Sequence, residues 1–362
     1  MRYALIGCGR VSVNHVKAAR DNGFDIAAVC DTDASHIDRM FENSGVSETE
    51  SACIRRFFDW NEMLDAVHPD IVSIALPSGL HAEAACDVIL RGINCIIEKP
   101  MAMSIDSADR IISAAEKTGV TVSVCHQNRF NDAVREMRSE LEMGHFGRLS
   151  NAAVTVRWHR DKQYYSQASW RGKWASDGGT LMNQCIHGID LLRWMCGDEI
   201  ESVYGITNNV CHPYIEAEDI GAAVIKFKNG IIATVEGTVN VNLTDMEEHL
   251  TLIGEHGSMK LGGTCANTVE FRSFDGEPDR SNRLFHENVE NVYGNGHTRL
   301  FGDVAAAIKE HRAPFVDVYA GKRAIETVLA IYKSAHDGAP VRLPLDCAAA
   351  TDFDDTVWGE RK

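Results

Sequence analysis

The sequence predicts an α/β protein of two domains. We expect a doubly wound parallel sheet over residues 1–125 and an α+β domain with a large, mostly antiparallel open sheet over residues 126–362. In the first third, short apolar runs rich in β-branched residues alternate with amphipathic stretches, which is typical of a parallel sheet covered by helices on both faces. After about residue 125 the apolar runs follow one another directly, which is typical of strands joined by hairpins. The length of 362 residues also favours two domains.

The elements of the first domain can be placed in order along the chain. Strands are expected at residues 3–7, 25–31, 70–77, 94–100 and 120–126. Helices are expected at residues 11–22, 81–92 and 107–119, with a polar helix after residue 31. This alternation predicts parallel strands linked by helical crossovers.

The second domain begins with a strand at residues 150–160, in which every second side chain is apolar. These side chains are Ala152, Val154, Val156 and Trp158. Asn229-Gly230 between two apolar runs predicts a hairpin, and a second hairpin is expected over residues 250–261. Apolar residues at helical spacing predict amphipathic helices at residues 300–308 and 325–332.

The composition argues against several classes of function. Hydrophobic residues make up 44% and charged residues 24% of the chain, which disfavours disorder and a fibrous protein. The net charge of −16 repels nucleic-acid backbones and anionic lipids. No apolar run approaches the ~20 residues of a spanning helix, and the first run is too short for a signal peptide. We therefore expect a cytoplasmic protein with a small-molecule substrate.

The 11 cysteines are expected to be reduced and mostly structural. None of them forms a CxxC pair or a spacing typical of zinc ligands. The histidines also lack companions at ligand spacing, so we expect no metal site.

The turn GCGRVS at residues 7–12 matches the G-x-G-x-x-G pattern except for Ser12 in the third glycine position. Gly7 allows a tight turn, and Gly9 lets a pyrophosphate approach the backbone and the N-terminus of the following helix. The second strand ends at Asp31, where a carboxylate can accept both ribose hydroxyls and would repel a 2′-phosphate. The combination predicts a Rossmann domain that binds NAD rather than NADP. The alternative is that Asp31 only caps the next helix.

Two further segments bring polar residues to positions where chemistry is expected. Lys99 lies at the carboxyl end of a parallel strand, where it could steer a substrate hydroxyl or pass a proton, or could be a solvated charge. If residues 177–195 form one helix, then Asn183, His187, Asp190 and Trp194 share a stripe. Asn183 and Asp190 could then orient His187 as a general base, although a hydrogen-bonded core histidine is an equal alternative.

These motifs together resemble the Gfo/Idh/MocA oxidoreductases over essentially the whole chain. The resemblance rests on GCGRV at 7–11, Asp31, ALPSGLHAE at 75–83, EKP at 98–100, QNRF at 127–130, GGTL at 178–181 with HxxD from His187 to Asp190, and residues 324–344. It implies that Lys99 positions the sugar hydroxyl and assists proton movement, that His187 is the base, and that hydride passes to C4 of the nicotinamide. The cofactor-binding residues that it implies are Gly7, Cys8, Gly9, Arg10, Val11, Asp31, Leu76, Pro77, His81, Glu98, Lys99 and Gln127.

Within the family, residues 126–131, 164–174 and 181–192 are most similar to the branch that oxidises the 3-hydroxyl of UDP-N-acetylglucosaminuronate for surface polysaccharide. Many sugar and inositol dehydrogenases of the family carry Asp at the position of Asn183. A neutral amide there would avoid placing a carboxylate beside an anionic uronate. The resemblance also implies that 2-oxoglutarate can reoxidise bound NADH.

An anionic nucleotide sugar requires cations, and basic and aromatic residues gather between residues 157 and 174. The expected substrate-binding residues are Arg157, Arg160, Tyr165, Asn183 and His187. Any one residue of the basic and aromatic cluster could instead belong to a solvated strand and loop or to a subunit contact.

Two other functions stay open, namely an inositol or free-sugar dehydrogenase on the same scaffold and a non-catalytic NAD-binding regulator. By resemblance, the sheet of the second domain should pack against another subunit, so we expect a homodimer or homotetramer.

Overall fold

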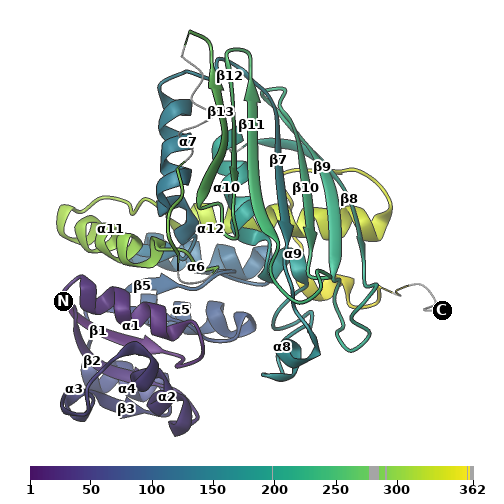
Figure 1. The fold of residues 1–362 in the computed structure, drawn as a ribbon. Helices are drawn as coiled ribbons and strands as arrows, with labels where there is room; N and C mark the ends of the chain where they lie inside the picture. Colours follow the sequence, from purple (N-terminus) through teal and green to yellow (C-terminus); the bar gives the residue numbers. More distant parts are fainter. Residues whose placement is uncertain (198, 277–284, 290–291, 357, 359–362) are drawn as a thin grey trace. The chain divides into compact units, whose positions relative to one another are not determined.

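The computed structural model describes residues 1–197, 199–276, 285–289, 292–356 and 358. It contains a six-stranded parallel sheet and an eight-stranded mixed sheet, which confirms the predicted fold class (Figure 1). The chain divides into two compact units. The first contains Met1–Ala102, Asp106–Cys125 and His297–Lys322, and the second contains Met103–Ile105, His126–Gly296 and Arg323–Lys362. This packing is discontinuous in sequence, because residues 297–322 pack with the first unit.

The first unit is built on a sheet with strand order β3-β2-β1-β4-β5-β6. Its strands are β1 Arg2–Ile6, β2 Asp25–Cys30, β3 Arg55–Phe57, β4 Ile71–Ile74, β5 Asn94–Ile97 and β6 Val122–Val124. Its helices are α1 Ser12–Asp21, α2 Ala34–Ser44, α3 Glu48–Cys53, α4 Trp60–Val67, α5 His81–Leu90, α6 Ile105–Thr118 and α11 Gly296–Glu310. The order reverses between β1 and β4, and the carboxyl edge of such a sheet is where ligands bind.

Strand β3 of this unit was not predicted, and the helix expected at residues 300–308, which is α11, was predicted to belong to the second domain. β3 has only three residues, of which two are arginines, so it lacks the apolar run from which a buried strand is predicted. α11 joins the unit from far along the chain, because Phe301 lies against the rings of Tyr3 and Phe24.

The second unit is built on a sheet with order β13-β12-β11-β7-β10-β9-β8-β14. Its strands are β7 Leu149–Arg157, β8 Ile200–Asn208, β9 Ile220–Phe227, β10 Ile232–Thr238, β11 Glu247–Gly254, β12 Gly257–Gly262, β13 Thr268–Phe274 and β14 Val341–Arg342. Its helices are α7 Asp132–Glu142, α8 Lys162–Ser166, α9 Thr180–Asn183, α10 Ile186–Cys196 and most of α12 Val318–Asp337. Neighbouring strands of this sheet are antiparallel, except that β7 and β10 are parallel. Both predicted hairpins, β9–β10 and β11–β12, are confirmed.

Helices cover one face of the eight-stranded sheet (Figure 1). α10 lies directly on β7 at Gly188, where a Cβ atom would come within 2.7 Å of the Val154 side chain. α12 approaches β8 at Gly205, where a Cβ atom would meet Ile331 at 2.7 Å. The predicted alternation in β7 is confirmed, since Val154 and Val156 are buried on this face.

Within the described residues, none of the 11 cysteines is in a disulfide. No helix in the described part of the chain combines the length and the apolar character needed to cross a lipid bilayer.

Candidate active site

The turn between β1 and α1 has the shape that a pyrophosphate site requires. Gly7 has φ +91°, and a Cβ atom there would lie 2.4 Å from the carbonyl oxygen of Ala75, so only glycine fits. A Cβ atom on Gly9 would have no neighbour within 4 Å, and Gly9 and Arg10 are exposed, so the backbone is open to a ligand. This free space in front of the N-terminus of α1 fits the diphosphate of a dinucleotide.

Asp31 directly follows β2, and its carboxylate is tied to the same turn. One oxygen accepts the backbone N–H of Cys8 at 2.8 Å, and the other accepts the N–H of Asp33 at 2.9 Å. His36 Nδ1 lies 3.1 Å from the second oxygen. The cap of α2 is Asp33 rather than Asp31, so a helix cap does not explain Asp31. The carboxylate is oriented beside the turn, as the ribose of NAD requires.

Beyond β4 lie Leu76 and Pro77, which are both half-buried, and His81 at the start of α5. Both ring nitrogens of His81 face protein carbonyls, Nδ1 at 2.7 Å from Pro100 and Nε2 at 2.8 Å from Leu76. Burial lowers the pKa of His81 despite these two acceptors. The side chain of His81 therefore links the segments after β4 and β5, which shapes the edge of the sheet.

Glu98 and Lys99 follow β5 at the same edge. Glu98 is buried, whereas Lys99 is half-buried. The Glu98 carboxylate accepts the backbone N–H of Lys99 at 3.1 Å and a hydrogen bond from His15 Nε2 at 2.8 Å. The strand end that bears Lys99 is thus joined to α1, the helix that follows the glycine turn.

In the second unit, residues 177–195 do not form a single helix. α9 ends at Asn183 and α10 begins at Ile186. The carbonyl of Thr180 accepts the N–H groups of both Gln184 and Cys185, which interrupts the regular hydrogen-bond pattern. Asn183 and His187 are therefore on different helices.

His187 is buried near the start of α10, and its Nε2 lies 3.5 Å from Nε2 of Gln127. The expectation that Asp190 orients His187 is wrong. Both Asp190 oxygens accept from Arg129, in a bidentate pair at 2.6 and 2.7 Å. Burial would raise the pKa of Asp190, but the charge and hydrogen bonds of Arg129, together with the charges of His126 and Arg323, lower that pKa. Asp190 therefore holds α10 against the segment 127–130, which carries Gln127.

Asn183 belongs to a hydrogen-bonded chain that reaches Arg160. Its amide nitrogen donates to Asp177, and its oxygen accepts from Gln184 Nε2 at 2.6 Å. The Gln184 oxygen accepts from Arg160 Nε at 3.0 Å, and Arg160 also pairs with Asp245 at 2.7 Å. Two predicted substrate residues, Asn183 and Arg160, are thus brought together. A carboxylate still lies beside Asn183, because Asp177 supplies it.

Arg157 and Tyr165 lie in other surroundings. Arg157 is on the face of β7 opposite Val156, where it pairs with Glu236 at 2.7 Å and with Glu247 at 2.5 Å. The hydrogen bonds that Arg157 donates to these carboxylates raise its pKa, and its charge is already balanced. Tyr165 is buried and packs against the rings of Tyr164 and His212.

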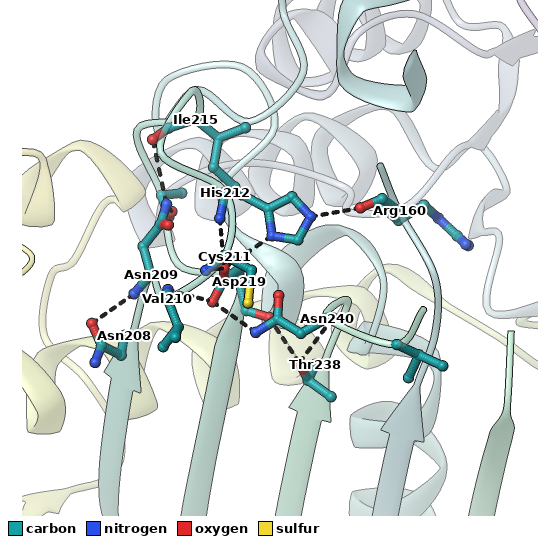
Figure 2. Close-up of polar contacts among 12 residues, drawn as sticks. Arg160, Asn208, Asn209, Val210, Cys211, His212, Ile215, Asp219, Thr238 and Asn240 are labelled. Atoms are coloured by element: carbon teal, nitrogen blue, oxygen red, sulfur yellow. Dashed lines mark hydrogen bonds and ion pairs between the residues drawn. The ribbon is translucent and has the colours of Figure 1, made fainter. Parts of the chain in front are cut away.

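A buried carboxylate supports the backbone at Arg160 (Figure 2). Asp219 accepts the N–H groups of residues 210–212 and a hydrogen bond from Nδ1 of His212 at 2.9 Å. Nε2 of the same ring donates to the carbonyl of Arg160 at 2.6 Å. Since both nitrogens face acceptors, His212 is best satisfied as an imidazolium. This ion pair fixes the loop after β8 to the segment after β7.

Protein-family models match both parts of the chain. Residues 1–126 match the oxidoreductase family with an NAD-binding Rossmann fold, and residues 134–260 match the GFO/IDH/MocA C-terminal domain. The chain belongs to the Gfo/Idh/MocA oxidoreductase family. The predicted resemblance is confirmed, and so are the enzyme class and NAD as the cofactor.

This Gfo/Idh/MocA oxidoreductase is similar to two solved dehydrogenases. The WlbA dehydrogenase from Bordetella pertussis, in complex with NADH and UDP-GlcNAcA, is 33% identical, with 95% of this chain and 99% of that chain covered and a TM-score of 0.84. The WlbA dehydrogenase from Chromobacterium violaceum, with the same two ligands, is 31% identical, with 96% of each chain covered and a TM-score of 0.84. Inositol 2-dehydrogenase 2 of Saccharopolyspora erythraea is 26% identical over 82% of each chain.

Several supporting residues of this oxidoreductase were missed by sequence reasoning. Gln184 and Asp177 lie close to Asn183 in the sequence, so polar residues near Asn183 could be recognised. The hydrogen bonds that these residues form with Asn183 could not be predicted. His15 and His297 also escaped, because no local spacing connects either of them with Glu98.

Proposed function

We propose that this protein uses NAD to oxidise the C3 hydroxyl of a UDP-linked N-acetylated sugar acid such as UDP-N-acetylglucosaminuronate. The observation that carries the proposal is the similarity, above 30% over nearly full length, to two dehydrogenases whose solved structures contain NADH and UDP-GlcNAcA. The polar chain from Asn183 to Arg160 adds support, because it places amide and guanidinium donors together.

In the proposed reaction, His187 accepts the proton of the C3 hydroxyl as the general base. Lys99 orients that hydroxyl from the end of β5 and assists proton movement. NAD, when bound, supplies the carbon, C4 of the nicotinamide, that receives the hydride. Gly7, Gly9 and Asp31 hold the dinucleotide through open backbone and ribose hydrogen bonds. Cys8, Arg10, Val11, Leu76 and Pro77 stay predicted cofactor contacts.

For the anionic groups of the substrate, the geometry favours Arg160 over Arg157. Arg157 is balanced by two glutamates on an exposed sheet face. Arg160 pairs with a single aspartate, and its guanidinium lies over the rings of Trp158 and Tyr164. Arg160 can therefore offer a remaining donor to a phosphate or a carboxylate beside aromatic surfaces that suit a base or a sugar.

A substrate panel tests this function. Purified enzyme is incubated with NAD and, in separate reactions, UDP-N-acetylglucosaminuronate, myo-inositol and simple hexoses, while NADH absorbance is followed. Parallel reactions contain 2-oxoglutarate. If NADH stays tightly bound to the enzyme, turnover is then detected as the reduction of 2-oxoglutarate. We expect turnover with the nucleotide sugar. Turnover only with myo-inositol or hexoses would instead favour the activity that the Saccharopolyspora erythraea relative is named for.

A non-catalytic regulator is the remaining alternative, and it would bind NAD without reducing it in any of these reactions. The presence of both Lys99 and His187 argues against it, because a regulator requires neither.

We also propose that the exposed face of the eight-stranded sheet joins subunits into a homodimer or homotetramer. This face carries apolar side chains on neighbouring strands, including Tyr204, Ile206, Val224 and Ile232. Ile206→Lys should lower the mass measured by light scattering during size-exclusion chromatography, whereas Leu90→Lys, at an exposed position of α5, should not. A wild-type monomer would contradict the proposal.

A further inference from the structure

Four buried polar side chains meet behind the strand end that bears Lys99. They are His15 of α1, Glu98 after β5, Cys125 after β6 and His297 of α11. One donor or acceptor atom of each lies within 4.8 Å of those of all the others. None of the four belongs to the base, the hydroxyl-steering group or the pyrophosphate turn described above, so the proposed reaction leaves them without a role.

The centre of the cluster is the Glu98 carboxylate. One oxygen accepts from Nε2 of His15 at 2.8 Å and from Nε2 of His297 at 3.5 Å. The other oxygen accepts the backbone N–H of Lys99 at 3.1 Å. Burial would raise the pKa of Glu98, but the hydrogen bonds from the two histidines outweigh it and hold that pKa well below its usual range. Glu98 is therefore a buried carboxylate anion.

The same four residue types could bind zinc, but their spacing favours a hydrogen-bond network. Two tetrahedral ligands at about 2.0–2.1 Å from one zinc ion are about 3.3 Å apart. The His15–Glu98 distance of 2.8 Å is shorter than this and is a normal hydrogen-bond length. Burial together with the Glu98 charge also raises the pKa of Cys125, so Cys125 remains a thiol.

The network acts on Lys99 by two routes. Glu98 holds the Lys99 backbone by a hydrogen bond. The cluster also interacts electrostatically with the Lys99 ammonium, whose charge acts to lower the pKa of both His297 and Cys125. His15 stands one turn into α1, the helix whose N-terminus faces the cofactor turn. The cluster therefore connects the pyrophosphate site with the residue that steers the hydroxyl.

We propose that Glu98, held by His15 and His297, is a positioning residue that fixes the backbone of Lys99 relative to the cofactor turn and keeps a buried negative charge one residue from Lys99. This inference rests on the proposed function, in which Lys99 orients the substrate hydroxyl. Glu98, which the resemblance gave as a cofactor contact, is buried together with the two histidines, and in this proposal all three act through Lys99.

The test compares Glu98→Gln and His15→Phe with a control, Glu42→Gln, which removes an exposed carboxylate from α2 of the same unit. Three quantities are measured: kcat and KM with NAD and UDP-N-acetylglucosaminuronate, NADH affinity from quenching of protein fluorescence, and the pH dependence of Lys99 acetylation by acetic anhydride, read by mass spectrometry. Chemical unfolding establishes that each variant is folded.

For Glu98→Gln we expect kcat to fall about 10- to 100-fold, the scale of a misplaced reacting group. NADH affinity should stay within about threefold, because the glycine turn is intact. Acetylation of Lys99, and not of the other lysines, should begin at lower pH, because the loss of a nearby negative charge makes the ammonium easier to deprotonate. His15→Phe should shift kcat in the same direction, and Glu42→Gln should match the wild type.

The proposal is overturned if folded Glu98→Gln keeps wild-type kcat and the wild-type Lys99 acetylation profile. One zinc ion per chain in protein purified without added metal would also overturn it, in favour of ligation. If the wild type oxidises no sugar, the proposed function fails, but Lys99 acetylation and NADH affinity still decide whether Glu98 controls Lys99.

Discussion

Arg129 and Asp190 form a bidentate ion pair in which both components are buried. Arg129 lies in the short segment that carries Gln127, and Asp190 lies one turn after His187 on α10. The pair therefore locks together the two segments that bring Gln127 and His187 within 3.5 Å.

Removing one partner of this pair should destabilise the protein strongly. Arg129→Met leaves the buried Asp190 carboxylate without its guanidinium partner, which costs about 3–5 kcal/mol of unfolding free energy. The double variant Arg129→Met/Asp190→Leu should recover much of this loss, because no unpaired charge remains. Urea unfolding followed by circular dichroism gives both values. Equal stabilities for the wild type and Arg129→Met would show that the pair does not hold α10.

Replacing His187 should remove the general base. We expect His187→Ala to lower kcat by about 10²–10⁴, with little change in NADH affinity. The control is His256→Ala, which removes an exposed imidazole from the β11–β12 turn of the same unit. Rapid-mixing measurements of NADH formation separate chemistry from product release. Unchanged chemistry in His187→Ala would eliminate the proposed role.

The His212–Asp219 pair predicts a pH dependence of stability. Burial favours the neutral ring, but hydrogen bonds to Asp219 and the Arg160 carbonyl raise the pKa of His212 above its usual 6.5. A pKa raised on folding contributes stability that is complete below the unfolded value and is lost as pH rises through the folded value. The stability advantage of the wild type over His212→Gln should therefore be largest below pH 6.5 and decline above it. Urea unfolding from pH 5.5 to 9 measures this advantage, and an advantage that grows with pH would have the wrong sign.

Glu218 is a buried carboxyl group that stays protonated, and it also predicts a stability that falls as pH rises. Its oxygen accepts the N–H of Leu181 and the hydroxyl of Tyr332, while burial raises its pKa to about 8. Between its usual 4.5 and about 8, the unfolded chain loses this proton and the folded chain keeps it, so stability falls as pH rises.

Glu218→Gln removes that titration. Between pH 5 and 7.5, its unfolding free energy should therefore rise relative to the wild type by up to about 1.4 kcal/mol per pH unit. The measurement is urea unfolding of both proteins in matched buffers. A difference that does not vary with pH would mean that Glu218 is ionised in the folded protein.

The parts of the fold that local patterns determine were predictable. Strand β7 alternates buried and exposed side chains, and Asn229-Gly230 adopts a hairpin turn, because both depend on neighbouring residues. Gly7 was predictable as well, since its positive φ is a property of one residue in a motif.

The supporting contacts of the site depend on residues far apart in the chain and were not predictable. The periodicity of residues 183–194 indicated a continuous helix, but Cys185 packs against Gly237, where a Cβ atom would come within 2.5 Å, and the helix is interrupted beside it. Asp190 was assigned to His187 because they are one turn apart, yet a guanidinium 61 residues away is the stronger partner for a buried carboxylate.

We propose that the protein removes hydride from C3 of UDP-N-acetylglucosaminuronate and transfers it to NAD. The most direct test supplies this substrate with deuterium at C3 and analyses the reduced cofactor by mass spectrometry after a single turnover. We expect reduced cofactor that is one mass unit heavier than NADH, together with a 3-keto sugar product. Reduced cofactor without deuterium would contradict the proposed reaction. So would a failure to reduce NAD with the UDP sugar when myo-inositol or a hexose does reduce it.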